Sequence, residues 1–329
     1  MKDYDVILAS GAEHLRARFE EHGVRVFTCE MNYDGKRMFP NADIYVRVPE
    51  VEELSDRRVV VVQSCTGSGP AEPERLSTAD RVVELLLILD VLSRPVHVEK
   101  TGHKQYKTTR VVPPARVDVV LTFQPFSLQD KAFTTGEAVS GRWATETIAR
   151  ACNHLWIVNP HAPIETPWMD ALKKRGVLDT IDVTQDLIRY GAQQLGLGDD
   201  YIVVTPDEGG QQRFAVEGYG KKRTDSYTVE LTGDLEVEDQ HVFVVDDLTK
   251  SGSTLLKAAD RLRQQGAKDV ALAVAHVLPL AQHGEALLAR LIEKSGKRVF
   301  VSNTVRTKIF CEDNPQLTYN VVDTLTRVL

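Results

Sequence analysis

The chain has 329 residues, of which 42% are hydrophobic and 26% are charged, as in a globular protein with one large core or two domains of ordinary size. Its formal net charge of −7 argues against a protein that coats nucleic acid, so we expect no nucleic-acid partner. No apolar run reaches the length of a membrane span, and the first residues enter a strand-like run without the features of a signal peptide, so no membrane association is expected.

The four cysteines carry no metal-site or redox signature. Cys29, Cys65, Cys152 and Cys311 are scattered along the chain, and no two of them have the CxxC spacing. This usage is typical of a reduced compartment and predicts neither disulfides nor structural zinc. We therefore expect a cytoplasmic protein.

Strand-like and helix-like segments alternate from the start, which predicts an α/β fold with mostly parallel sheets. In the first half, strands are expected at 5–10, 24–29, 43–48, 58–64, 118–123 and 155–159, and helices at 11–22, 78–92 and 137–151. Residues 97–117 fit this pattern poorly, because they carry five Lys or Arg and one acid, with Gly102 placed to turn a hairpin.

The second half repeats the alternation after a proline-containing segment at 160–167, so we place a domain boundary near 165. The two expected domains are 1–165 and 166–329, with the last helix packing back on the first domain. Further strands are expected at 201–205, 242–245, 268–276 and 299–303, and helices at 184–195, 284–295 and 321–328. Within 211–241, the segment GYGKKRTDS has the basic, polar character of a functional loop.

The stretch 242–266 is the most informative part of the sequence. A short apolar run, 242–245, predicts a buried strand with Asp246 and Asp247 at its carboxyl end. Small hydroxyl residues and Gly252 then precede an amphipathic helix that ends at Gly266. Backbone N–H groups of such a loop and the helix N-terminus favour an anion, and the two acids suit sugar hydroxyls or a divalent metal. The alternative is a turn with helix-capping hydroxyls and no ligand.

Four other segments place polar residues next to predicted strands. They are 39–43, 123–131, 159–162 and 205–210. In open α/β sheets the carboxyl ends of the strands are where ligands bind. His161 and Asp207 could share a divalent metal, although a lone histidine and a surface loop are the structural alternatives.

In their order these motifs resemble the ribose-phosphate pyrophosphokinases, and most closely the archaeal type. VVDDLTKSGST at 244–254 is similar to the signature of the phosphoribosyltransferase superfamily, in which two acids grip a ribose and the loop holds its 5-phosphate. FPNADIYVRV, FQPFSLQDK, the helix and strand ending in NPHA, TPDEGG, KKR at 221–223 and VSNT at 301–304 follow the family's order. The resemblance covers nearly the whole chain.

The resemblance implies two phosphoribosyltransferase-like domains, each a mostly parallel sheet flanked by helices. The first would be the ATP side, and the second the sugar-phosphate side with a catalytic loop at 218–230. The implied enzyme moves the β,γ-diphosphoryl group of ATP to the anomeric hydroxyl of ribose 5-phosphate and leaves AMP. It would use Mg²⁺ and act as a homodimer or hexamer with the ATP site at a subunit interface.

The resemblance also assigns residue roles. The catalytic pair would be Lys221 and Arg223, and the metal residues His161 and Asp207. The ATP-binding residues would be Phe39, Asn41, Asp43, Gln129, Asp130 and Lys131. The sugar-phosphate residues would be Asp246, Asp247, Thr249, Lys250, Ser251, Gly252, Ser253 and Thr254.

Four departures from the family pattern leave alternatives open. Leu128 stands where the family has an arginine, Asn159-Pro160 replaces Asp-Leu, the 97–117 segment has no counterpart, and Lys250 adds a cation to the phosphate loop. A cation there would suit a more highly charged acceptor such as ADP-ribose. The loss of the arginine would also suit a non-catalytic regulatory homologue. A phosphoribosyltransferase that consumes the activated sugar is a third alternative, which the KKR loop and the two-domain length disfavour.

Overall fold

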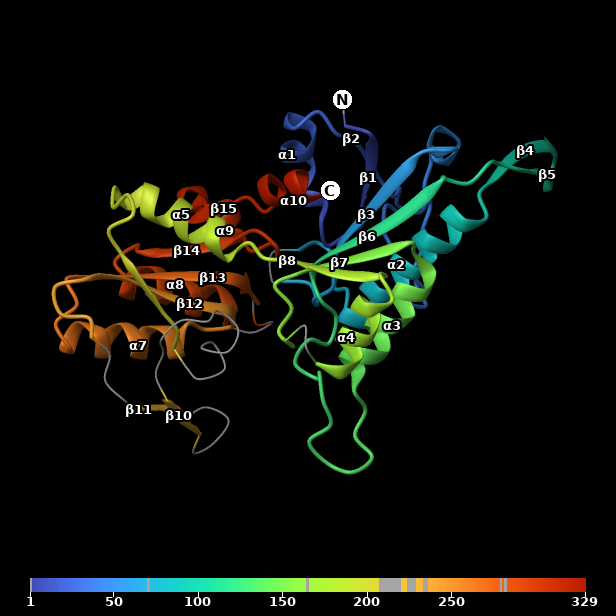
Figure 1. Ribbon diagram of the computed structural model, residues 1–329. Helices are drawn as coiled ribbons and strands as arrows, with labels where there is room; N and C mark the ends of the chain where they lie inside the picture. Colours follow the sequence, from blue (N-terminus) through green and yellow to red (C-terminus); the bar gives the residue numbers. More distant parts are fainter. Residues whose placement is uncertain are drawn as a thin grey trace. The chain divides into compact units, whose positions relative to one another are not determined.

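The computed structural model describes residues 2–69, 72–163, 166–206, 220–223, 229–232, 236–278, 280 and 283–329. The chain divides into two compact units. Unit 1 comprises Met1–Ser68, Glu72–Ile181 and Leu325–Leu329, and unit 2 comprises Gly69–Ala71 and Asp182–Thr324. Each unit is built around its own parallel sheet, so the predicted α/β class is confirmed (Figure 1).

Unit 1 contains a six-stranded sheet in the order β2-β1-β3-β6-β7-β8, in which every pairing is parallel. Its strands are β1 (Tyr4–Leu8), β2 (Arg25–Thr28), β3 (Arg58–Ser64), β6 (Arg116–Phe123), β7 (His154–Val158) and β8 (Leu178–Ile181). The central strands are buried on both faces, which explains why β3 is an almost unbroken valine run.

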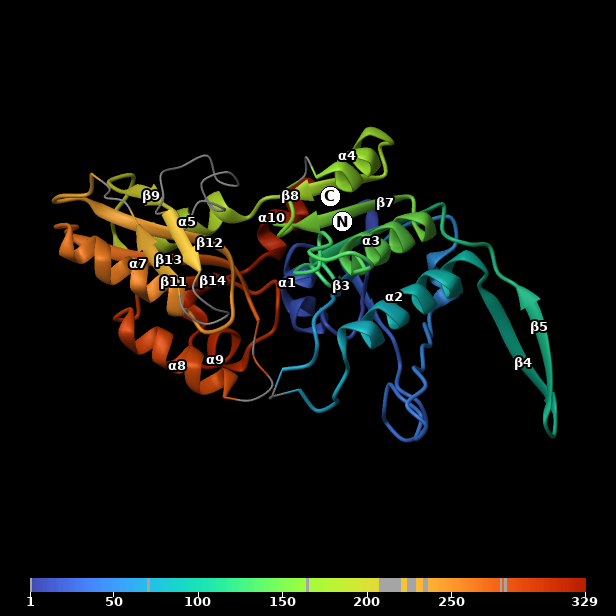
Figure 2. The same cartoon turned by 90° about the horizontal axis from the view of Figure 1, so that it is seen from below.

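Helices cover both faces of this sheet. On one face the helices are α2 (Thr78–Ser93), α3 (Ser140–Ala151) and α4 (Pro167–Lys174), and their apolar residues form one core with alternate residues of the strands (Figure 2). The segments η1 (Glu13–Leu15) and α1 (Arg16–Glu21) bury Leu15 and Phe19. The short η2 (Val51–Leu54) adds two further buried side chains.

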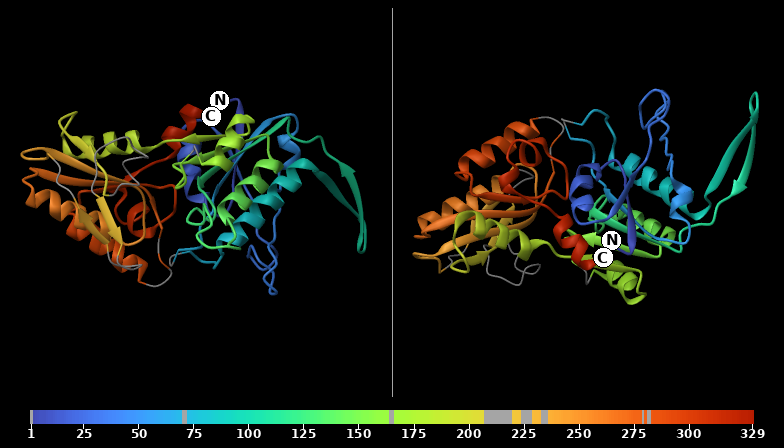
Figure 3. Two further views of the ribbon diagram at one scale, coloured as in Figure 1. Left: turned by 60° about the horizontal axis from the view of Figure 1, so that its bottom comes forward. Right: turned by 90° about the horizontal axis from the view of Figure 1, so that it is seen from above.

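One part of unit 1 lies apart from its core. The strands β4 (Val96–Gly102) and β5 (Gln105–Arg110) pair antiparallel as a separate two-stranded sheet. We call this hairpin the β4–β5 arm. It projects away from the other elements of unit 1 in every view (Figure 3). The hairpin expected around Gly102 is confirmed.

Unit 2 contains a five-stranded parallel sheet in the order β15-β14-β13-β12-β9. Its strands are β9 (Ile202–Val204), β12 (His241–Thr249), β13 (Asp269–Val277), β14 (Val299–Ser302) and β15 (Thr318–Tyr319). A second pair, β10 (Gly220–Arg223) and β11 (Val229–Thr232), is antiparallel. The segment expected as a basic loop therefore contains a short hairpin.

The helices of unit 2 lie on both faces of its sheet. Helix α5 (Thr184–Leu195) covers one face, and α7 (Ser253–Gln264) and α8 (Gly284–Lys294) cover the other (Figure 1). Gly191 of α5 permits close contact, because a Cβ there would lie 2.7 Å from the Phe300 ring. The chain ends with α9 (Lys308–Cys311), η3 (Pro315–Leu317) and α10 (Val322–Val328). Among the described helices, none has both the length and the apolarity to cross a membrane.

Several details differ from the sequence-based expectations. Residues 43–48 were expected to form a strand, but they form only one isolated β-bridge, Met38↔Ile44. Their backbone hydrogen bonds to the preceding segment are too irregularly spaced to form a regular strand pairing. Helix α4 and strand β8 were missed. Since β8 pairs with β7, unit 1 continues to Ile181, beyond the boundary expected at 165.

The last residues of the chain group with unit 1. The Arg58 guanidinium donates to the carbonyl oxygen of Leu329 at 2.8 Å, and the Lys2 ammonium donates to that of Thr326 at 2.7 Å. These contacts tie the end of α10 to the first strands of unit 1.

Candidate phosphate and sugar site

The two adjacent acids, Asp246 and Asp247, lie on β12. This strand and β13 have nine residues each. The strand was expected to end at Val245, yet it continues to Thr249, because β13 pairs with it as far as Thr249↔Val277. The other neighbour, β9, stops at Val244↔Val204. Asp246 and Asp247 therefore lie where β12 has lost its pairing with β9, at the carboxyl end of the sheet.

The two carboxylates have different surroundings. Side chains alternate along a strand, so Asp246 and Asp247 point to opposite faces of β12. Asp247 is only 3% exposed, whereas Asp246 is half-buried. The Asp246 carboxylate accepts a hydrogen bond from the Asp247 backbone N–H at 3.0 Å, which fixes its orientation. Of the two, Asp246 is the one more accessible to a ligand.

The loop between β12 and α7 is held by its own hydroxyl groups. Thr249 Oγ1 accepts from the Gly252 N–H at 2.9 Å, and Ser251 Oγ accepts from the Ser253 N–H at 3.4 Å. Ser251 and Ser253 hydroxyls lie 3.3 Å apart. These backbone N–H groups were expected to face a ligand, but side chains of the loop already accept hydrogen bonds from two of them, those of Gly252 and Ser253.

The groups left at the surface of the loop are suited to an anion. Ser253 and Lys250 are exposed, and Thr254 is half-exposed in the first turn of α7. Helix α7 has 12 residues and no side-chain cap, so its N-terminal N–H groups add positive potential. Two hydroxyls, an ammonium and a helix N-terminus thus lie within five consecutive residues, and this combination of groups favours an anion.

Gly252 is required by the shape of this loop. Its φ of +72° is in the left-handed region, which disfavours residues with a Cβ. A Cβ at this position would also lie 2.5 Å from Leu291 Cδ1 on α8. The turn and the contact between α7 and α8 both depend on glycine here.

A buried polar cluster that the sequence did not predict supports the neighbouring strand ends. His276 on β13 is 2% exposed, and its Nδ1 lies 2.8 Å from Thr304 Oγ1. Ser302 Oγ donates to the Ala275 carbonyl at 2.6 Å. The VSNT run at 301–304 was expected only as a family motif. Its polar residues follow a buried strand, which is the sequence signal that could have predicted this cluster.

In unit 1 the expected ATP segment 129–131 follows β6. Gln129 is held through its backbone, which accepts from the Gly141 N–H and donates to the Phe126 carbonyl. The Asp130 carbonyl accepts from the Trp168 indole at 3.1 Å, and the Lys131 ammonium lies 5.5 Å from the Phe133 ring centroid. The side chains of Gln129 and Lys131 are exposed, so both are accessible to a ligand.

The second expected ATP segment, 39–43, forms a tight turn. The Phe39 N–H donates to the Asp43 carbonyl at 2.9 Å, and the Asn41 amide donates to the Asp43 carboxylate at 2.5 Å. The Phe39 ring packs edge-on against Tyr45 at 5.6 Å. Asn41 and Asp43 are exposed at the tip of the turn.

His161 follows β7, the strand next to β6, so it shares an edge of the unit 1 sheet with the 129–131 segment. Its expected metal partner, Asp207, lies outside the described residues. In the parts of the chain that the structure describes, no group of three or more His, Cys, Asp or Glu side chains could hold a metal ion by itself.

The expected catalytic residues Lys221 and Arg223 both lie on β10. Their backbones pair with Leu231 and Val229 of β11. Within the expected loop 218–230, the structure describes only residues 220–223 and 229–230.

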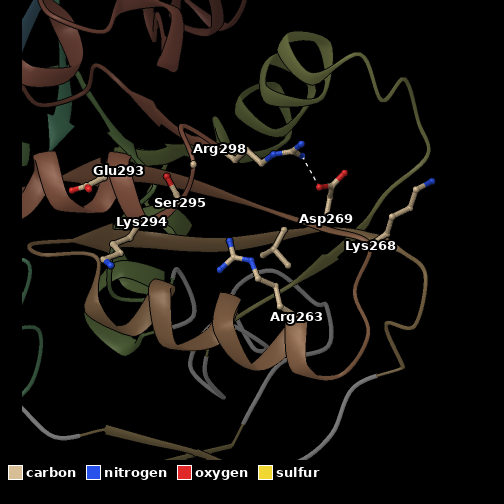
Figure 4. Close-up of a pocket in the computed structure, with 9 residues that line it drawn as sticks. Arg263, Lys268, Asp269, Glu293, Lys294, Ser295 and Arg298 are labelled. Carbon is tan, nitrogen blue, oxygen red and sulfur yellow. Dashed lines mark ion pairs between the residues drawn. The ribbon is translucent and has the colours of Figure 1, made fainter.

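A surface pocket lies at the other end of the unit 2 sheet. It is formed where β13 and β14 begin and where α7 and α8 end, and Arg298 pairs there with Asp269 at 3.1 Å (Figure 4). Two of its basic residues, Arg263 and Lys294, lie in the last turns of α7 and α8, where they complement the helix dipoles. This pocket is therefore separate from the β12–α7 loop and includes none of the expected site residues.

Comparison with known proteins supports the reading of the loop. The model of the phosphoribosyl transferase domain matches residues 192–308, which include β12, the loop and α7. A ribose-phosphate pyrophosphokinase of Pyrococcus abyssi is 25% identical over 313 residues, covering 92% of this chain and 93% of that protein. This chain is similar to ribose-phosphate pyrophosphokinases along most of its length.

Two further relatives show how widely the similarity extends. Ribose-phosphate pyrophosphokinase 2 of Archaeoglobus fulgidus is 27% identical over 279 residues, covering 82% of this chain and 83% of that protein. The crystal structure of phosphoribosylpyrophosphate synthetase from Mycobacterium smegmatis has a TM-score of 0.70 at 24% identity, covering 99% of this chain and 97% of that one. The fold of that synthetase therefore extends over both units of this chain.

Proposed function

We propose that this enzyme transfers the β,γ-diphosphoryl group of ATP to the anomeric hydroxyl of ribose 5-phosphate. The anomeric oxygen forms a bond to the β-phosphorus, the bond from that phosphorus to the oxygen bridging to the α-phosphorus breaks, and the hydroxyl proton is released. The products are phosphoribosyl pyrophosphate and AMP. The observation that carries the proposal is the β12–α7 loop with its two acids, in a chain similar to ribose-phosphate pyrophosphokinases over 92% of its length.

The β12–α7 loop would bind the acceptor. Asp246 would accept hydrogen bonds from the ribose hydroxyls, since its carboxylate is half-buried and oriented by the Asp247 N–H. The Ser253 and Thr254 hydroxyls, the N-terminus of α7 and the Lys250 ammonium would bind the 5-phosphate. The hydrogen bonds inside the loop keep it formed before binding, which lowers the entropic cost of binding.

The donor side is proposed from unit 1 and the β10–β11 hairpin. Phe39, Asn41, Asp43, Gln129, Asp130 and Lys131 would bind ATP. Lys221 and Arg223 would stabilise the negative charge that develops on the transferred phosphoryl group, which is the main contribution of protein side chains to phosphoryl transfer. Closure of these basic residues over the substrate would also exclude water and limit ATP hydrolysis.

Mg²⁺ is the metal we propose, held by His161 and Asp207 together with ATP oxygens. A histidine and one carboxylate leave most coordination positions to phosphate and water, which suits a cation that keeps much of its hydration shell. When bound, the ion would neutralise charge on the triphosphate.

The reaction is tested by measuring AMP and phosphoribosyl pyrophosphate formed from Mg-ATP and ribose 5-phosphate. Lys221→Ala should lower kcat by about 100-fold or more, because a charge that stabilises the transition state is lost. Lys222→Ala removes an equal charge one residue away and should retain most of the activity. Absence of acceptor-dependent AMP release by the unmodified enzyme would refute the proposal and favour a regulatory homologue.

ADP-ribose is the comparison acceptor, because Lys250 adds a positive charge to the phosphate loop. With ribose 5-phosphate as the true acceptor, its kcat/KM should exceed that of ADP-ribose, and Lys250→Ser should change this ratio only slightly. A preference for ADP-ribose that Lys250→Ser removes would reassign the acceptor while leaving the diphosphoryl transfer intact.

We further propose that the enzyme works as a homo-oligomer in the cytoplasm. The scattered positions of its four cysteines, without CxxC spacing, are the sequence feature that supports a reducing compartment.

A further inference from the structure

The β4–β5 arm has almost no support from its own chain. Every residue of Val96–Thr101 and Gln105–Arg110 is exposed. At its base, the Val111 N–H donates to the Pro95 carbonyl at 3.0 Å and His97 Nδ1 lies 2.5 Å from Glu52 Oε1. An isolated two-stranded hairpin is marginally stable in water and normally needs a surface to pack against. The arm therefore has the properties of an element completed by a partner.

One face of the arm is apolar and basic. The cross-strand pairs Val96↔Arg110, Val98↔Thr108 and Lys100↔Tyr106 place these six side chains on one face. Val96, Val98 and Tyr106 are 46%, 54% and 65% exposed. Exposed β-branched and aromatic residues beside cations are a composition typical of contact surfaces.

The ends of the arm are stiffened. Pro95 precedes β4, and Pro113 and Pro114 follow β5. Proline fixes the backbone φ angle and restricts the residue before it. The arm is thus held in one direction, which reduces the entropy lost when it docks.

The charge of the arm indicates which surface it fits. Residues 96–112 carry four Lys or Arg and one Glu, a net charge of +3, while the whole chain carries −7, which leaves −10 on the remainder. Two arms would repel each other, whereas an arm and the body of another copy would attract. The same negative body would repel the phosphates of nucleic acid, which disfavours that class of partner.

We infer that the β4–β5 arm docks on the body of a second copy of this chain, with the face that carries Val98, Tyr106 and Arg110 in the contact. In a closed two-fold dimer each copy would donate one arm and receive one. Burial of apolar side chains in this contact would supply affinity. Charge complementarity would favour docking on the negatively charged body of the other copy over docking on its arm.

The first test shortens the arm in the full-length protein. Because Val96 and Arg110 face each other across the strands, Asn-Gly can join them as a two-residue hairpin turn. Sedimentation velocity should give a dissociation constant between copies at least about 10-fold higher for the shortened protein. Added salt should weaken self-association of the unmodified protein more than that of the shortened one. An unchanged dissociation constant would overturn the inference.

A matched pair of substitutions tests the face. Thr108→Glu and Thr109→Glu make the same charge change on neighbouring residues that point to opposite faces of β5. Only Thr108→Glu should weaken self-association, and both variants should retain the melting temperature that the unmodified protein has at a concentration where it is monomeric. Equal effects of the two variants would contradict the assignment of the face. This pair also decides the question if the shortened protein does not fold.

Two direct measurements identify the occupant. A photo-crosslinking benzoyl-phenylalanine at position 106, in a mixture of light and isotopically heavy copies, should give mixed crosslinked pairs that map to acidic segments. Crosslinks confined to single copies would overturn the inference. Retention of a mixed-sequence DNA duplex or RNA by the unmodified protein alone, with self-association unchanged in the shortened protein, would show a nucleic-acid arm instead.

Discussion

Single residues decide whether the β12–α7 loop can form. Thr249 and Ser251 use their hydroxyls to fix the loop backbone, while Ser253 and Lys250 remain exposed. Gly252 has two separate reasons to be glycine, its positive φ and its contact with Leu291. The two reasons can be separated experimentally, because other glycines of unit 2 have only the first.

Gly252→Ala should lower the free energy of unfolding by about 3 kcal/mol, through left-handed backbone strain and overlap with Leu291. The KM for ribose 5-phosphate should rise as well. Gly196→Ala is the control, because Gly196 has a φ of +68° and no atom lies within 4 Å of the place that its new methyl group would occupy. It should cost about 1 kcal/mol. Equal losses in denaturant unfolding of the two variants would show that the Leu291 contact does not matter.

At the scale of elements, α2 does more than cover the sheet of unit 1. Arg81 and Glu84 are 1% and 2% exposed, although both are charged. Glu84 accepts from the Ser10 backbone and from the Gln63 amide, and Arg81 pairs with Glu72 at 2.5 Å. The network joins α2 to the carboxyl ends of β1 and β3, where the strand order of the sheet reverses direction. Helical periodicity alone did not reveal it.

Helix α2 begins with a capping box, in which Ser77 Oγ accepts from the Asp80 N–H and the Asp80 carboxylate accepts from the Ser77 N–H. Ser77→Ala should lower the free energy of unfolding by about 1 kcal/mol, because one helix N–H loses its acceptor. Ser93→Ala at the exposed end of the same helix should cost much less. Chemical denaturation with unchanged m values would measure both. Similar losses at the two positions would exclude the cap as the cause.

At the scale of the whole molecule, charged groups bind the strands of unit 1 to one another. Asp5 on β1 is 1% exposed and accepts from Arg25 of β2 and from Arg57, which precedes β3. Burial alone would raise the pKa of this carboxyl, but the hydrogen bonds and charges of Arg25 and Arg57 outweigh it and hold the pKa below its ordinary value. Its ionised form therefore favours the folded state.

Asp5→Asn should lower the free energy of unfolding at pH 7 by about 2 kcal/mol, since two charged hydrogen bonds are weakened. A lowered pKa in the folded state contributes stability above the ordinary pKa of Asp, and this contribution is lost as the pH falls through the folded value. Stability should thus depend less on pH below about 4 in Asp5→Asn than in the unmodified protein. Asp3→Asn, at an exposed position, should leave the pH profile unchanged, and a flattened profile there would contradict the assignment.

The sequence by itself determined the local elements and the order of the motifs. Alternation of apolar runs with helical periodicity is a local property, so β3, α2, α5 and α8 were located within a residue or two. The β12–α7 loop was located because small hydroxyl residues and a glycine stand between a predicted buried strand and an amphipathic helix, and its role in binding phosphate stays a prediction. Gly102 within a basic segment predicted the hairpin of the arm. The sequence did not predict that this hairpin would lie apart from the core.

Only the tertiary structure decided the features that depend on residues distant in sequence. The extension of β12 to Thr249 follows from its pairing with β13, and the end of unit 1 at Ile181 follows from the pairing of β8 with β7. The requirement for glycine at 252 depends on Leu291, and the burial of Arg81 depends on partners on other strands. Strand pairing and side-chain packing join residues that no local pattern relates, because their free energy arises only when the chain is folded.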